Sequence, residues 1–553
     1  MPVFKSKHPD IACMYSLHLD NHVSCIRLTS VQVPEDCTIW EWLFDEKSSY
    51  SPLNKFPQTD WAGYTDAATK EHLSWKGVKD AATHISTALR SKYGFQANDT
   101  ISLFSRNTIW YPVTLFAAVR LGGIVSGASP AYNVEEMAYA LKTANSKYLA
   151  THPTSIKVAK QAARIAGIPK SHIFLLEGEL EGYTTVQQLV QMGKSQGEHD
   201  QAPVSRLPPG KKNGEVCAFL SFSSGTTGLP KAVMISHQNA IAQALQIEML
   251  KPDDYPRKAL GVLPLFHITG IVHCMILPVF INAEVIMLPA FSMVSMLSAV
   301  VEYQIPELLL VPPILIRLVR DPTVAKYDLS CVKRFSSGAA PLSAEIIQQL
   351  REKFPGTIVA STEVKLMRGD KTEAGIGEPG EIWARGPQIV MGYLSNDKAT
   401  KETFDADGFL HTGDEGMIDD EGFITITDRI KEMIKVNGIG IAPAELEDLL
   451  LGHVKVEDSA VLGIPDDWSG ERPKAYVVLK KGVAPGESIG RELIQYVEEN
   501  KVKHKWIKEI EFIDEIPKSA SGKILRRVLR DKAKQGIQGT VVKVDSGGPR
   551  ARL

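Results

Sequence analysis

The chain has 553 residues, of which 44% are hydrophobic and 23% charged, with a formal net charge of −2 at pH 7. This length exceeds what one ordinary hydrophobic core supports, so we expect at least two domains. The balanced charge argues against nucleic acid and against an anionic membrane surface as partners. The locally basic stretch 523–534 has the spacing of a solvated helix face.

The two most apolar stretches, Gly270–Ile281 and Leu308–Val319, are too short to span a bilayer, so we expect them in the core. The amino terminus lacks the apolar run of a signal peptide. The six cysteines include no C-x-x-C pair, which indicates neither a zinc site nor a redox dithiol. Few cysteines in a long chain suit a reducing compartment.

From about Thr38 to Val311 the sequence alternates between helical patterns and short apolar runs. The clearest are the expected helices Lys76–Tyr93 and Tyr111–Leu121 and the expected strands Ile101–Phe104 and Ile305–Val311. Such alternation predicts an α/β architecture built mainly on parallel sheets.

A second group of signals begins near Asp405, where Asp407-Gly408 and Glu421-Gly422 indicate turns between short strands of a small β-rich unit. We place a domain junction at about Asp428–Glu432, which divides the chain into residues 1–428 and 429–553. The second part is expected to be a small mobile α+β domain with the helices Ala442–Leu451 and Ser488–Asn500, the strands Ser459–Gly463 and Pro473–Lys480, and a terminal basic helix.

The most distinctive segment is Ser221–Lys231, which reads S-F-S-S-G-T-T-G-L-P-K and follows an apolar run. Its glycines allow tight turns and a close approach of the backbone to a ligand. Its hydroxyl groups and its terminal lysine suit the binding of a polyphosphate. Neither glycine is followed directly by lysine, so the segment is not the nucleotide loop of ordinary ATPases and kinases.

This segment resembles the signature loop of the adenylate-forming superfamily, which includes acyl-CoA and aryl-CoA synthetases, firefly-type luciferases and peptide-synthetase adenylation domains. The chain is most similar to the coumarate-CoA-ligase-like branch, from Val33 onward. The resemblance implies ATP, magnesium and coenzyme A as cofactors and a small carboxylic acid as substrate. It also implies phosphate contacts from Ser223, Ser224, Gly225, Thr226, Thr227, Gly228 and Lys231.

Further motifs of this superfamily occur in the expected order. His267, in L-P-L-F-H-I-T-G, resembles the residue at the acyl pocket, where an imidazole would orient the carboxylate or the thiol. A core histidine is the plain alternative. Gly338, Ala339 and Ala340 resemble the segment along adenine. Asp414 resembles the carboxylate that accepts both ribose hydroxyls, with Arg429 as its partner; a turn cap is the alternative for Asp414.

The resemblance also assigns residues to the small domain. Lys431 occupies the hinge position about which this domain rotates between two half-reactions. Lys435 and Gly438 resemble the segment that reaches the site during thioester formation. Lys523, in P-K-S-A-S-G-K, resembles the catalytic lysine, a cation placed where charge grows as pyrophosphate leaves.

One motif of the superfamily has no match here. The aromatic-Gly-x-Thr-Glu sequence, whose Thr and Glu hold phosphate and magnesium, is absent between residues 338 and 414, so the metal ligands are unknown. Thr362-Glu363 lacks the preceding aromatic-glycine pair and lies too close to Gly380, so it resembles the strand after the missing block. Residues 11–32 have no counterpart in the superfamily, and misjudged exon boundaries would account for both anomalies.

Three functions therefore compete. The first is an ATP-dependent acyl-CoA ligase that works through an acyl-adenylate. The second is an adenylating enzyme that serves a carrier protein or a luciferase-type oxidation. The third is a catalytically impaired nucleotide- or acyl-binding homologue. The last three residues, Ala551-Arg552-Leu553, match the class of the peroxisomal import signal, so we expect an import receptor as partner and the peroxisome, otherwise the cytoplasm, as location.

Overall fold

The computed structural model describes residues 33–49, 51–223, 230–249, 257–337, 363–369, 372–419, 424–430, 432–437, 439–466, 469–519, 523–536 and 539–543. Among these residues, no helix has both the length and the apolar character needed to cross a membrane.

An eight-stranded sheet forms the centre of the large N-terminal domain, in the order β16-β9-β8-β4-β3-β5-β6-β7. The strands from β8 to β7 are parallel, and β9 and β16 are antiparallel additions at one edge. The sheet confirms the predicted α/β architecture. Its strands are β3 (Thr100–Phe104), β4 (Ile124–Ala128), β5 (Ser146–Thr151), β6 (Ile173–Leu175), β7 (Thr184–Thr185), β8 (Cys217–Ser223), β9 (Lys231–Ser236) and β16 (Gly392–Tyr393).

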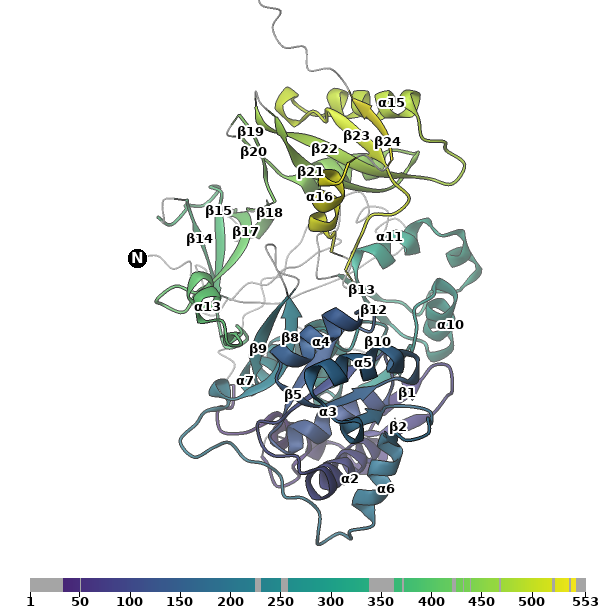
Figure 1. Cartoon of the computed structure of the whole chain (residues 1–553), viewed down its shortest axis with the longest axis vertical. Coiled ribbons are helices and arrows are strands. Elements are labelled where there is room, and N and C mark those ends of the chain that lie inside the picture. Colours follow the sequence, from purple (N-terminus) through teal and green to yellow (C-terminus); the bar gives the residue numbers. More distant parts are fainter. Residues whose placement is uncertain are drawn as a thin grey trace, which may run out of the picture.

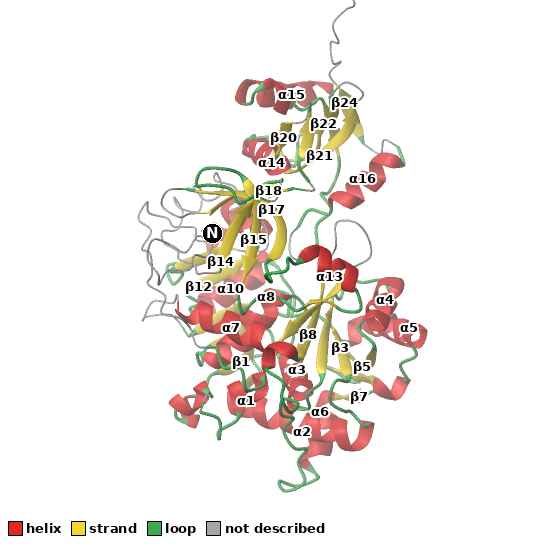
Figure 2. Cartoon of the chain, turned by 90° about the vertical axis from the view of Figure 1, so that its left-hand side faces the viewer, coloured by secondary structure: helices red, strands yellow, loops and turns green. Residues whose placement is uncertain are grey.

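Helices cover both faces of this sheet, with α4 and α5 on one side of it and α7 on the other (Figure 2). The helix predicted at Lys76–Tyr93 is α2. It starts at Ser74, whose side chain accepts a hydrogen bond from the Gly77 amide. It ends at Gly94, whose φ of 71° is unfavourable for residues that have a side chain. The helices here are α2 (Trp75–Tyr93), α3 (Trp110–Arg120), α4 (Val134–Thr143), α5 (Ile156–Ala166), α6 (Val186–Lys194) and α7 (His237–Met249).

A second sheet, in the order β10-β11-β1-β2, and the parallel pair β12-β13 complete the large domain. The two apolar stretches predicted to lie in the core contribute buried side chains, such as Met275 and Leu318. The strands are β1 (Gly63–Asp66), β2 (His72–Ser74), β10 (Lys258–Gly261), β11 (Glu284–Met287), β12 (Glu307–Leu310) and β13 (Arg334–Ser337). The helices are α1 (Ile39–Phe44), α8 (Ile268–Gly270), α9 (Leu277–Phe280), α10 (Met293–Tyr303) and α11 (Pro312–Arg320), with a π-helical segment at Ile271–Ile276.

The predicted β-rich unit is an antiparallel sheet in the order β14-β15-β17-β18. Gly408, in the predicted Asp-Gly turn, has a φ of 81°. Strand β18 ends at Arg429, and the first strand of the C-terminal domain begins at Ile434. The chain therefore passes between the two units at residues 430–433. The elements are β14 (Glu363–Met367), β15 (Gly380–Arg385), β17 (Leu410–Ile418), β18 (Ile424–Arg429) and helix α13 (Asp397–Thr403).

The C-terminal domain is a sheet in the order β20-β19-β22-β23-β24, with β21 also paired to β22, and helices packed against it. The two predicted helices and two predicted strands are present, but the strands extend further because β21 and β22 pair along their whole length. The elements are β19 (Ile434–Val436), β20 (Ile439–Ile441), β21 (Val456–Asp466), β22 (Gly470–Leu479), β23 (Glu509–Phe512), β24 (Thr540–Lys543), α14 (Pro443–Gly452), α15 (Glu487–Asn500) and α16 (Arg526–Lys534).

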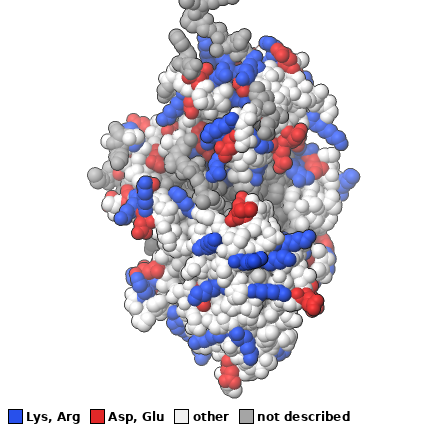
Figure 3. Space-filling model, in the orientation of Figure 1, with Lys and Arg blue, Asp and Glu red and all other residues white. Residues whose placement is uncertain are grey.

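The C-terminal domain lies at one end of the large domain, next to α11 (Figure 1). Acidic and basic side chains are interspersed over the C-terminal domain, while Lys and Arg side chains form a band across the middle of the large domain on this face (Figure 3).

Candidate adenylation site

The stem of the glycine-rich loop is the hairpin of β8 and β9. Ser223 and Lys231 face each other across this hairpin, and residues 224–229 between them, with the predicted phosphate contacts from Ser224 to Gly228, lie outside the described residues. The Lys231 ammonium lies 4.9 Å from the centre of the Tyr393 ring, a cation–π contact that holds the charge at the base of the loop. The Tyr139 hydroxyl donates to the carbonyl of Pro230 at 3.0 Å. The stem is therefore tied to α4 and β16.

Asp414, in the middle of β17, and Arg429, at the end of β18, form a cross-strand pair. The Arg429 Nε donates to Asp414 Oδ1 at 3.1 Å, with 43% and 27% of the two side chains exposed. Gly413 precedes the aspartate with a φ of 75°, and its amide donates to Glu381 Oε1 at 3.1 Å. This local geometry leaves the second carboxylate oxygen of Asp414 available to accept hydrogen bonds from hydroxyl groups.

His267 caps the short helix α8, and its loop is held by close backbone contacts. Its Nδ1 accepts the Thr269 amide at 3.4 Å and contacts the Thr269 hydroxyl at 3.1 Å. Because Nδ1 acts as an acceptor, Nε2 carries the proton of the neutral ring and is a donor. Burial and the charge of Lys523 both lower the pKa of His267, which favours this neutral form.

Asn107, after β3, fixes the segment that leads to His267. Its amide nitrogen donates to the carbonyls of Gly261 at 3.1 Å and Leu263 at 2.9 Å, and its oxygen accepts the Leu265 amide at 3.1 Å. Gly127 at the end of β4 packs directly against the Phe266 backbone. The histidine loop is thus built on the carboxyl edge of the central sheet, where ligands bind in open α/β sheets.

Lys523 lies on a tight loop of the C-terminal domain, before α16. Lys518 and Ile524 form an antiparallel bridge, the Ser519 amide donates to the Lys523 carbonyl at 2.8 Å, and the Lys523 amide donates to Ser519 Oγ at 3.2 Å. These bonds close the loop around residues 520–522, which the structure does not describe. The lysine is therefore presented from a short, hydrogen-bonded hairpin rather than from the helix.

Lys523 of the C-terminal domain lies close enough to Asp414, Arg429 and His267 to interact with each of them electrostatically, although the four residues come from two domains. Burial lowers the pKa of Lys523, the Arg429 charge lowers it further, and Asp414 and Glu432 oppose this. Burial raises the pKa of Asp414 against the opposing charges of Arg429 and Lys523. Charged groups with shifted pKa values that gather between domains are typical of a functional site.

Two family models match this chain: the AMP-binding enzyme model at residues 54–361 and the AMP-binding enzyme C-terminal domain model at residues 445–523. The chain belongs to the AMP-binding enzyme family. Curated relatives of this AMP-binding enzyme are CoA ligases. A probable CoA ligase of Humulus lupulus is 34% identical over 84% of this chain and 89% of its own length. A peroxisomal OPC-8:0-CoA ligase of Arabidopsis thaliana is 33% identical over the same shares.

Solved structures support the fold of the AMP-binding enzyme. The anthranilate CoA ligase AuaEII, in complex with anthranoyl-AMP, superposes with a TM-score of 0.79 at 21% identity, over 91% of this chain and 98% of its own. The predicted superfamily, its coumarate-CoA-ligase-like branch and the α/β fold with a separate C-terminal domain are therefore confirmed. These relatives are named as CoA ligases, which are acid–thiol ligases, and this chain shares their AMP-binding enzyme family.

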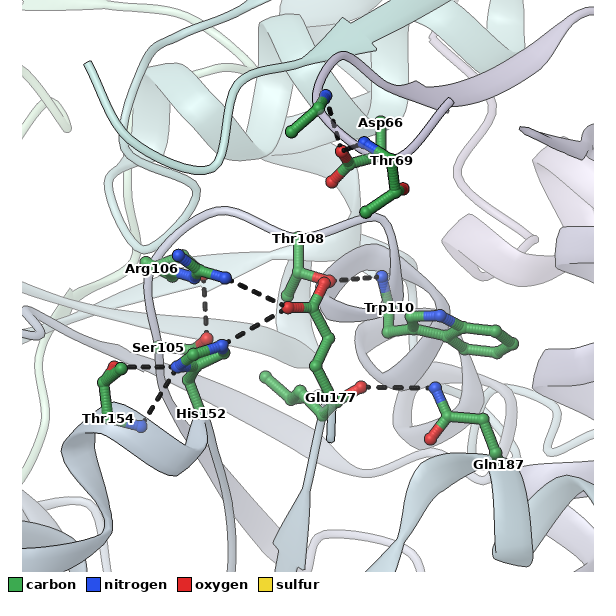
Figure 4. A network of polar contacts seen from close by, with 12 residues as sticks. Asp66, Thr69, Ser105, Arg106, Thr108, Trp110, His152, Thr154, Glu177 and Gln187 are labelled. Atoms are coloured by element: carbon green, nitrogen blue, oxygen red, sulfur yellow. Dashed lines mark hydrogen bonds and ion pairs between the residues drawn. The ribbon is translucent and has the colours of Figure 1, made fainter. Parts of the chain in front are cut away.

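A polar network that the sequence did not indicate supports the loop after β3 in this AMP-binding enzyme (Figure 4). Glu177 contacts the Arg106 guanidinium at 3.5 Å and His152 Nε2 at 3.3 Å. Burial works to raise the pKa of Glu177, but hydrogen bonds from His152 and Thr108 and the Arg106 charge outweigh it and lower this pKa. The network joins the ends of β3, β5 and β6 beside Asn107.

The remaining predicted site residues are placed as follows. Lys435 lies on β19 and is exposed. Gly338, Ala339, Ala340, Lys431 and Gly438 lie outside the described residues, as do Thr362 and the C-terminal Ala551-Arg552-Leu553. Glu363 begins β14, which agrees with its interpretation as part of the strand after the missing block.

The basic stretch 523–534 was predicted to be a solvated helix face, and for Arg526 this is wrong. Its guanidinium donates to Glu432 Oε2 at 2.7 Å and to both carboxylate oxygens of Glu447, with only 11% of the side chain exposed. The spacing of charges cannot reveal this pairing, because both carboxylates are distant in the sequence. Arg526 thus anchors the start of α16 to the segment after the hinge position.

Proposed function

We propose that this chain activates a carboxylic acid with ATP and transfers the acyl group to coenzyme A. The single observation that carries the proposal is the convergence of Lys523 with Asp414, Arg429 and His267. Such a set offers a carboxylate for ribose hydroxyls, cations for phosphates and a neutral imidazole donor for the acid. The hydroxyl-rich loop after Ser223 and the cation of Lys231 would hold the triphosphate.

The first half-reaction forms a bond between an acid oxygen and the α-phosphorus of ATP, while the bond from this phosphorus to the bridging oxygen breaks and pyrophosphate leaves. Negative charge grows at the transferring phosphate, and the Lys523 ammonium would stabilise it. His267 Nε2 would donate to the carboxylate and fix its direction of attack. In the second half-reaction the thiolate sulfur attacks the acyl carbon, AMP leaves, and the thiol proton passes to solvent.

Magnesium usually accompanies ATP, and coenzyme A is the thiol substrate that the relatives' names imply. Within the described ranges, no three or more His, Cys, Asp or Glu side chains are grouped so that they could hold a metal ion. The metal ligands therefore stay unassigned, and no step above depends on them.

The test is acid-dependent exchange of pyrophosphate into ATP by the purified chain, with a panel of carboxylic acids. We expect exchange with at least one acid, and a fall of about 10²- to 10³-fold in Lys523→Gln, the scale for removal of one transition-state donor. Lys532→Gln, an exposed lysine on α16, is the matched control and should keep the wild-type rate. Equal rates in the two variants would contradict the role of Lys523.

One observation favours a second candidate, a homologue that binds nucleotide without turnover. The AMP-binding enzyme model stops matching at residue 361, directly before β14, where the aromatic-Gly-x-Thr-Glu block is missing from the sequence. This candidate predicts that ATP raises the melting temperature while no acid supports exchange. An enzyme that serves a carrier protein instead predicts exchange without consumption of coenzyme A.

We also propose peroxisomal import through Ala551-Arg552-Leu553. The terminal tripeptide supports it, and one relative is named as peroxisomal. A fluorescent fusion that keeps this carboxyl terminus should be found in peroxisomes, and deletion of the three residues should leave it in the cytosol. A peroxisomal signal that survives the deletion would contradict the assignment.

A further inference from the structure

Arg320, the last residue of α11 in the large domain, reaches across to the C-terminal domain. Its Nη2 donates to the carbonyl of Leu451 at 2.9 Å and its Nη1 to the carbonyl of Glu457 at 3.4 Å. The chain separates Arg320 from these acceptors by 131 and 137 positions. One guanidinium thus makes two hydrogen bonds between the domains.

Both acceptors are backbone carbonyls that the local structure leaves without partners of its own. Leu451 lies in the last turn of α14, where helical carbonyls have no intrahelical donor and carry the negative end of the helix dipole. Glu457 is the extra residue of a bulge in β21, because the pairing with β22 shifts between Val456 and Asp458. A bulge releases a residue from the ladder and can turn its carbonyl outward. Arg320 fits this pair of sites because its planar fork offers several donors around one charge.

This contact is connected to Lys523 by neighbouring residues. Asp458 directly follows the bulge and binds the Lys518 ammonium at 2.6 Å. Lys518 forms the base of the hairpin that presents Lys523. The position of the bulge relative to the large domain therefore sets the position of the lysine loop relative to Asp414 and His267.

We propose that Arg320 is a positioning residue for the first half-reaction: it docks the end of α14 and the β21 bulge against the large domain, so that Lys523 reaches the nucleotide side of the site. The inference rests on the proposed function and on its two half-reactions. Rotation of the C-terminal domain for thioester formation must break both hydrogen bonds, so Arg320 favours adenylation over the second step.

The decisive experiment measures the half-reactions separately in single-turnover reactions of the full chain. Formation of acyl-adenylate from acid and ATP reports the first, and transfer from added acyl-adenylate to coenzyme A reports the second. Arg320→Gln should slow the first about three- to fivefold, the scale of one partly exposed charged hydrogen bond, and should leave the second unchanged or faster. Arg320→Lys should recover part of the loss, because an ammonium can still reach one carbonyl.

Arg317→Gln is the matched control, one turn earlier on the same helix. Its side chain is exposed, and its guanidinium lies 5.5 Å from the centre of the Phe291 ring. We expect both half-reactions to keep wild-type rates in this variant. Equal loss of both half-reactions in Arg320→Gln would indicate a merely structural role, and unchanged rates would show that the contact does not position Lys523; either result overturns the proposal.

A second readout does not depend on activity. Trypsin cleavage between residues 429 and 435 reports how often the C-terminal domain leaves the large domain, and Arg320→Gln should accelerate it about three- to fivefold, whereas Arg317→Gln should not. If wild type forms no acyl-adenylate, the proposed function fails while this comparison still tests the docking contact. Unchanged cleavage in Arg320→Gln would reject the docking contact even in an active enzyme.

Discussion

Gly127→Ala should damage activation of the acid without affecting the nucleotide. An ideal Cβ at Gly127 would lie 2.5 Å from the carbonyl oxygen of Phe266 and 3.0 Å from its Cα. These are backbone atoms, so no side-chain rotation can relieve the contact. The residue after Phe266 is His267, whose imidazole we assign to the carboxylate. The substitution therefore pushes the acid-binding loop away from the central sheet.

The size of this displacement follows from the same distances. Ordinary contact begins at 3.4 Å, so the carbonyl must move by about 0.9 Å. A misplacement of about 1 Å in a reacting geometry can cost about 100-fold, and relaxation of the loop reduces the effect, so we expect a 10- to 100-fold loss. Overpacking of this kind also costs about 1–3 kcal/mol of unfolding free energy.

The assay is acid-dependent pyrophosphate exchange, with kcat/KM for the acid compared with KM for ATP. In Gly127→Ala, kcat/KM for the acid should fall by the stated factor. KM for ATP should stay within about twofold, because the three atoms nearest to the added Cβ all belong to Phe266 and none to the β8–β9 hairpin. Ser126→Ala is the matched control on the same strand. Its hydroxyl is buried and has no hydrogen-bond partner among the described residues, so its removal should leave both constants unchanged.

The reasoning would be refuted by a Gly127→Ala protein that melts within a few degrees of wild type and has an unchanged kcat/KM for the acid. A parallel rise in KM for ATP would also refute it, because the damage would then not be confined to the histidine loop. Gly270→Ala offers an independent check, since its Cβ would meet the Pro264 carbonyl oxygen at 2.2 Å in the same loop. It should reproduce the loss of acid activation.

Two further predictions concern pH. Burial lowers the pKa of His237 from 6.5 to about 4, and the ring accepts a hydrogen bond from the Ile39 amide at 3.2 Å. Between pH 6.5 and pH 4 only the unfolded chain binds a proton at this histidine. The unfolding free energy of the wild type, measured by urea titration, should therefore fall by about 3 kcal/mol over this interval. His237→Asn keeps an acceptor without titrating, so its stability should fall less steeply, and parallel curves would contradict the assignment. Arg429→Gln removes a repulsion that lowers the pKa of Lys523, so the alkaline limb of kcat/KM for ATP should move to higher pH; a limb that stays in place or moves lower would exclude this coupling.

Local patterns in the sequence predicted the elements that are specified by neighbouring residues. The Asp407-Gly408 turn and the helix at Lys76–Tyr93 both follow from such short patterns. Long-range contacts do not leave such a trace. Asn107 binds a loop about 155 positions away, the end of β21 depends on its pairing with β22, and Arg320 finds its acceptors only after the two domains have docked.

The sequence also could not show how the charges of the site act on one another. It supplied Asp414, Arg429 and Lys523 as separate motif residues, but the directions of the pKa shifts of Asp414 and Lys523 depend on burial and on the neighbours that folding brings close. The same holds for Glu432, which is an ordinary acidic residue in the sequence and becomes the shared partner of Arg526 and the site in the structure.

The repulsion between Arg429 and Lys523 has a consequence for how the two domains separate. Without a nucleotide, burial and the Arg429 charge disfavour the charged form of Lys523, and Asp414 and Glu432 offset them only in part. The negative phosphates of ATP would stabilise the charges of both Lys523 and Arg429, and would thereby favour the closed position of the C-terminal domain. Departure of pyrophosphate then withdraws most of the negative charge. The loss of negative charge that follows the chemical step would therefore also weaken the attachment of the C-terminal domain.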